Sequence, residues 1–159
     1  MERRMNRIAG IDPGLDGGLA VIDVDGPRPA VMPVATVGNK REIDERALMS
    51  WFIEHRPAHI FIERVQAMPK QGVVSMFNFG VGWGIVRGIC TGMGISYELV
   101  RPQEWQKVML AGQPRGSNYL VASRLWPHVD FRVSERTSRP HGGLVDAALI
   151  AEYGRRQTS

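Results

Sequence analysis

Three acidic residues stand at positions where an isolated charge is costly. Asp12 and Glu63 each end a short apolar run, and Asp146 interrupts the apolar stretch 144–153. Carboxylates gathered at one place repel each other and lose hydration, and a divalent cation relieves both penalties. Two such cations can activate a water molecule and stabilise a leaving oxygen during phosphodiester hydrolysis. The three acids together therefore predict a metal site for phosphoryl chemistry.

Each acid also has an ordinary structural interpretation. Asp12 precedes Pro-Gly and suits a turn, and Glu63 suits an exposed strand end. Asp146 suits the first turn of a helix, where the helix dipole favours an acid. The set of three is more specific than any one member.

His141 lies five residues before Asp146, in a Pro-His-Gly-Gly segment. A histidine there would contact the metal, position water or protonate the leaving group. The alternative is a solvated loop histidine. His55, His59 and His128 have no comparable acidic surroundings, and we interpret them as structural.

The elements that must position these groups follow from apolar periodicity and turn signals. Three strands close in sequence predict an antiparallel meander, and later strands separated by helices predict parallel crossovers. We expect an α/β single domain over 1–159, with a five-stranded mixed sheet flanked by helices, which is the element order of the ribonuclease-H-like fold. The expected strands are 7–12, 17–23, 30–36, 59–63 and 95–100, and the expected helices are 43–55, 73–94, 102–110, 118–125 and 144–153.

Within the helix 73–94, glycine recurs every four residues and places a smooth stripe on one face. Glycine disfavours helix by about 1 kcal/mol per site, a cost that close approach of another backbone offsets. Either the sheet or the same helix of a second subunit would supply that backbone, and we favour the sheet. The stripe consists of Gly80, Gly84, Gly88 and Gly92.

Composition sets broad limits. The chain has 159 residues and a net charge of +4, which suits one domain and permits a polyanionic partner. Cys90 is the single cysteine, so neither an intrachain disulfide nor a cysteine zinc site is expected. No apolar run is expected to approach the roughly 18 residues that span a bilayer, and no signal-peptide core follows the basic N-terminus. We expect a cytoplasmic protein.

The ordered motifs resemble a known family. Ile11-Asp12-Pro13-Gly14, the strand-terminal Glu63 and the late Asp146 resemble the RuvC-type Holliday-junction resolvases. The likeness covers nearly the whole chain and is strongest to the short phage and prophage forms. Four further stretches carry that likeness: MPKQG at 68–72, MFNFG at 76–80, VRPQEW at 100–105 and AEYGR at 151–155.

The resemblance implies a homodimer that binds a four-way DNA junction. Each subunit would cut one strand, using Mg²⁺ or Mn²⁺ held by Asp12, Glu63 and Asp146, and the paired symmetric nicks would be ligatable. Phe77 or Phe79 would stack on an unpaired base, although both also suit a helix core. Trp105 is better interpreted as a packing residue than as a DNA contact. The further implied DNA contacts are Lys70, Gln71, Lys107 and Arg115.

One departure from the family motif bears on catalysis. The short forms usually read His-Asp-Gly where this chain reads His141-Gly142-Gly143, so a fourth acid is missing and His141 is its candidate substitute. The segment 116–120 also lacks an expected lysine. A second hypothesis is therefore a protein that binds branched DNA without cutting it. Two others are an actin-like or sugar-kinase ATPase, which needs a second domain, and a nuclease for RNA–DNA hybrids.

Overall fold

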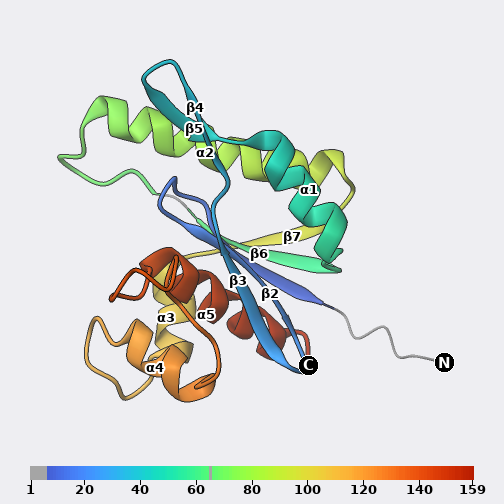
Figure 1. The fold of residues 1–159 in the computed structure, drawn as a ribbon, viewed down its shortest axis with the longest axis vertical. Helices are drawn as coiled ribbons and strands as arrows, with labels where there is room; N and C mark the ends of the chain where they lie inside the picture. The colour runs from blue at the N-terminus through green and yellow to red at the C-terminus, as the bar shows by residue number, and fades with distance from the viewer. Residues whose placement is uncertain (1–6, 65) are drawn as a thin grey trace.

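The structure, a computed structural model, describes residues 7–64 and 66–159. A five-stranded mixed sheet in the order β3-β2-β1-β6-β7 lies at its centre (Figure 1). Its strands are β1 Ile8–Asp12, β2 Gly18–Asp23, β3 Gly26–Val31, β6 His59–Glu63 and β7 Ser96–Val100, and a separate hairpin joins β4 Val34–Val37 to β5 Lys40–Ile43. The helices are α1 Glu45–His55, α2 Val73–Gly92, α3 Pro102–Met109, α4 Asn118–Leu125 and α5 Gly142–Gln157.

The sheet confirms the expected architecture. β1, β2 and β3 pair antiparallel, whereas β1 pairs parallel with β6 and β6 with β7. The predicted third strand, 30–36, was wrong in its bounds. β3 ends at Val31, and Val34 begins β4 of the separate hairpin. Pro33 stands between them, and proline has no backbone N–H with which to continue a strand ladder.

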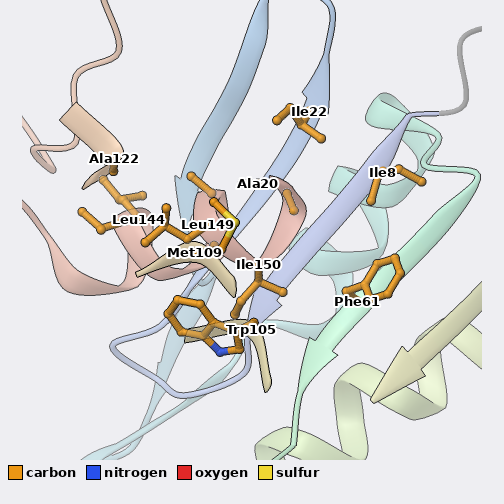
Figure 2. Packing of buried hydrophobic residues seen from close by; sticks show 14 of the residues in the cluster. Ile8, Ala20, Ile22, Phe61, Trp105, Met109, Ala122, Leu144, Leu149 and Ile150 are labelled. Atoms are coloured by element: carbon orange, nitrogen blue, oxygen red, sulfur yellow. The ribbon is translucent and has the colours of Figure 1, made fainter. Parts of the chain in front are cut away.

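Helices cover both faces of the sheet, with α3, α4 and α5 on one side and α1 and α2 on the other (Figure 1). Each face of the sheet packs against its helices in a separate hydrophobic core, and β1 contributes to both. Ile8 packs with α5, and Ile11 packs with the α1 and α2 layer. Gly10 lets α5 approach closely, because a Cβ there would lie 2.3 Å from the Ala147 carbonyl oxygen. Trp105 reaches into the α5 core (Figure 2).

The glycine stripe of α2 faces away from the sheet, so our preference for the sheet as its partner was wrong. All four stripe glycines are exposed, and a Cβ on any of them would meet nothing within 4 Å. The buried face instead carries Gly82, Val86 and Cys90. That series is offset by two residues from the stripe, which is about half a helical turn.

The expectation that no segment has membrane-spanning length and composition was also wrong. α2 has 20 residues, and an 18-residue window within it has a mean hydropathy of 1.4. Arg87 is the one charged residue in the helix. Only 17% of the window is buried, so most of its residues are at least partly exposed.

Candidate metal centre

The sheet brings the three predicted acids to one place. Ile11 of β1 pairs with Ile62 of the parallel neighbour β6, so the next residues, Asp12 and Glu63, end adjacent strands at the same edge. Asp146 is the fifth residue of α5, which packs across β1. All three side chains are half-buried.

The charges of these acids influence one another. Burial raises the pKa of Asp12 to about 6, with a further upward contribution from the charge of Asp146. Burial also raises the pKa of Glu63 to about 7, and the Asp12 and Asp146 charges add to that rise. The pKa of Asp146 is raised by its own burial. The folded protein therefore holds the three carboxylates against both desolvation and mutual repulsion.

Two of the three carboxylates accept a hydrogen bond from a side chain far away in the sequence, and sequence reasoning did not predict either pairing. The Trp105 indole Nε1–H donates to Glu63 Oε2 at 2.7 Å. The Asn118 amide Nδ2 donates to Asp146 Oδ1 at 2.8 Å. Trp105 is fully buried, which supports its predicted packing role. A buried indole needs an acceptor, and this was the one sequence signal available for the bond; no comparable signal identified Asn118.

His141 is the N-cap of α5. Its Nδ1 accepts from the backbone N–H of Gly143 at 3.1 Å and of Leu144 at 3.4 Å. A neutral ring that accepts at Nδ1 carries its proton on Nε2, so this arrangement suits a donor at Nε2 rather than a metal ligand. The two glycines that follow His141 differ in the room they leave for a side chain. A Cβ on Gly143 would lie 2.4 Å from the Gly17 carbonyl, whereas a Cβ on Gly142 would meet nothing within 4 Å.

A hollow of about 340 Å³ opens beside Asp12, between the β1–β2 loop and α2. Asp16 in that loop forms a 3.1 Å ion pair with Arg41 of β5, so the unpredicted hairpin contacts this side of the site. The lining residues are Asp12, Pro13, Gly14, Leu15, Asp16, Gly17, Ser75, Asn78, Phe79 and Gly82.

The predicted DNA contacts lie on two sides of the acids. Phe77 is 71% exposed and Phe79 43% exposed, so neither is a core aromatic, and Phe79 lines the hollow. Lys70 is exposed and Gln71 half-buried in the loop that leads into α2. Lys107 on α3 and Arg115 in the α3–α4 loop are both exposed. All are at least partly exposed, and of this set Phe79 lines the hollow beside Asp12.

The three acids fit a hydrated divalent cation. They offer only carboxylate oxygens, which suit Mg²⁺ or Mn²⁺. Within residues 7–64 and 66–159, no three acidic, histidine or cysteine side chains stand ready-made at ligating spacing. Mg²⁺ does not require such a cage, because it keeps several waters and binds through one or two carboxylates and substrate phosphates.

No family model and no curated protein matches the sequence. Among the solved structures that match the fold is T. thermophilus RuvC in complex with Holliday junction substrate, with a TM-score of 0.64, 21% identity and 95% of each chain covered. A second Thermus thermophilus RuvC structure has a TM-score of 0.62, 18% identity and 96% of each chain covered. The yeast mitochondrial Holliday junction resolvase Ydc2 has a TM-score of 0.62 and 13% identity, over 95% of this chain and 78% of that chain. The chain therefore has the ribonuclease-H-like fold in the form shared by RuvC and Ydc2.

Proposed function

We propose that this protein is an endonuclease that resolves four-way DNA junctions by divalent-metal-dependent hydrolysis. The carrying observation is the convergence of Asp12 and Glu63 on adjacent parallel strand ends with Asp146 of α5. Their raised pKa values favour a bound cation, because a cation relieves the repulsion that raises them. Two of the solved relatives in fold are named for Holliday junctions, which supports this substrate.

Asp12, Glu63 and Asp146 would hold Mg²⁺ or Mn²⁺. When bound, such a cation supplies an activated water and stabilises charge on the leaving oxygen. His141 has a separate part. With Nδ1 committed to the α5 backbone, its Nε2–H is the ring's donor, suited to a phosphate or leaving oxygen.

The exposed side chains around the site would bind the junction. Phe77 and Phe79 offer aromatic faces on the first turns of α2, where an unpaired base could stack for about 1–3 kcal/mol. The basic contacts would release counterions from the DNA, so binding would weaken steeply with salt. Those contacts are Lys70, Lys107 and Arg115, with Gln71 as a neutral donor.

A cleavage assay tests the proposed function. We expect a radiolabelled four-way junction to be nicked in Mg²⁺ or Mn²⁺ but not in EDTA, at symmetric positions in two opposing strands, with ends that ligase seals. Linear duplex, an RNA–DNA hybrid and ATP binding complete the panel. Preferred cutting of the hybrid, or ATP binding without cutting, would point to the other hypotheses.

Paired nicks require two sites, and the exposed face of α2 supports a homodimer. Glycines permit close helix approach there, and exposed apolar side chains surround them, which is typical of an interaction surface. The exposed apolar residues of this face are Val73, Val74, Phe77 and Val81.

We expect Gly84→Arg to convert a dimeric parent into a monomer. A side chain at Gly84 meets nothing within 4 Å in the protomer, so the fold accepts it, whereas a partner helix would be pushed away. Sedimentation velocity measures the change. Met49→Glu, at an apolar residue of α1 that is 42% exposed, is the control and should stay dimeric. A Gly84→Arg dimer would place the interface elsewhere.

The absence of a carboxylate at Gly142 favours a second candidate, a protein that binds junctions but cuts them poorly. We expect Gly142→Asp to raise the cleavage rate about tenfold, equivalent to roughly 1.4 kcal/mol of added transition-state stabilisation. The position is open, and an acid in the first turn of α5 suits the helix dipole. Single-turnover cleavage measures the gain. Gly142→Ala is the control, and equal rates for the two variants would deny this position a catalytic role.

A further inference from the structure

We propose that Trp105 and Asn118 are positioning residues, which orient Glu63 and Asp146 for the divalent cation. The inference rests on the metal-dependent function proposed above. It assigns to α3 and α4 a role that neither exposure nor charge indicates, because both donors come from side chains turned inward from these helices.

Trp105 is suited to hold one orientation of Glu63. The side chain is fully buried in the core between α3, α5 and the sheet (Figure 2), so water does not compete for its indole N–H. An indole nitrogen only donates, and Glu63 Oε2 at 2.7 Å is its acceptor. The bond joins residues 42 positions apart, so core packing of α3 determines where the carboxylate lies.

Asn118 acts in the same way on Asp146. It is the first residue of α4, and its Nδ2 lies 2.8 Å from Asp146 Oδ1. The third acid has a backbone donor instead, because the Gly14 N–H lies 3.4 Å from Asp12 Oδ1. Each carboxylate thus has one oxygen engaged by the protein, while its second oxygen has no hydrogen-bond donor among the described residues.

This division of oxygens is what a positioned metal site requires. A carboxylate held at one oxygen loses rotational freedom before the cation arrives, so less entropy is lost on binding. Removal of such outer partners typically costs about 10–100-fold in metal affinity or activity. A tryptophan that served packing alone would leave the affinity of the folded protein unchanged.

The test compares two tryptophan substitutions in the same core. Trp105→Phe removes the indole donor and keeps an aromatic ring. Trp126→Phe is the matched control, because Trp126 is 8% exposed in the same cluster and donates to no carboxylate among the described residues. Isothermal titration calorimetry of each DNA-free protein with Mn²⁺ alone gives its affinity for the metal. We expect about a tenfold loss for Trp105→Phe and none for Trp126→Phe.

Asn118 is tested in parallel. Asn118→Ala should weaken Mn²⁺ binding by a similar factor, and Asn118→Gln, which keeps an amide donor, should recover part of it. Thermal unfolding in EDTA shows that each variant is folded at the titration temperature. If a variant is unfolded at that temperature, NMR of the isotope-labelled parent replaces it. The Trp105 indole N–H resonance should shift when Mg²⁺ is added.

The outcomes separate this inference from the proposed function. Unchanged affinity in Trp105→Phe and Asn118→Ala, or a stationary Trp105 resonance while the metal binds, would overturn the positioning role and leave the nuclease proposal intact. A parent that binds neither Mn²⁺ nor Mg²⁺ would contradict the metal-dependent function, and the positioning role would fall with it. Equal losses in Trp105→Phe and Trp126→Phe would show a general packing effect instead.

Discussion

Asp146→Asn should reduce junction cleavage by about a thousandfold, which corresponds to roughly 4 kcal/mol of lost transition-state stabilisation. Asparagine keeps the shape of the side chain and an oxygen for the Asn118 amide, but it removes the charge that would hold the cation. Junction binding should stay equal or become tighter, because one negative charge near the phosphates is lost. Single-turnover cleavage and a gel-shift titration in Ca²⁺ measure the two effects.

Asp130→Asn is the control for this prediction. Asp130 is exposed and paired with Arg132, and its pKa is lowered to about 2 chiefly by hydrogen bonds from that arginine. The substitution removes the same charge from outside the site, so cutting should proceed at the parent rate. An Asp146→Asn protein that cuts as fast as the parent would disprove the metal-site assignment.

The second large effect is a loss of stability with rising pH in the absence of metal. The pKa of Glu63 is about 7 in the folded protein against 4.5 normally, and that of Asp12 is about 6 against 3.8. At a pH between the ordinary and the folded pKa of each acid, the unfolded chain has released a proton that the folded protein still binds. The free energy of unfolding therefore falls as the pH rises. Glu63 alone contributes a decrease on the order of 3 kcal/mol, complete above about pH 7.

Urea unfolding in EDTA across pH 4 to 8 measures this decrease, and saturating Mn²⁺ should reverse it at the upper end because the metal binds only the folded state. Glu63→Gln should flatten the curve and stabilise the metal-free protein near neutral pH. Glu54→Gln, an exposed residue of α1, should leave it unchanged. The lowered pKa of Asp130 acts below this range. If the parent's free energy of unfolding does not change with pH, burial and mutual repulsion do not destabilise the ionised acids.

The outline of the candidate site was predictable because its signals are local. An acid that ends an apolar run marks a strand end, and Asp146 within an apolar helix marks a charge that needs compensation. Parallel pairing of β1 with β6 follows from the helical crossover between them. The rotation of α2 was not predictable, because glycines and apolar residues occur on both of its faces. The β4–β5 hairpin was missed because Val34 continued the β3 pattern across Pro33.

The sequence by itself determined which groups are candidates for the chemistry: three carboxylates at or near element ends, a basic chain and a helix with one glycine-lined face. Only the tertiary structure decided how those groups are held. The hydrogen-bond donor of Glu63 comes from 42 residues away, and that of Asp146 comes from 28 residues away. His141 uses Nδ1 to accept from the α5 backbone. Such contacts depend on the packing of whole elements, and residue type and short-range spacing do not encode that packing. The charge that predicts a metal site is therefore local, whereas its orientation is a property of the folded core.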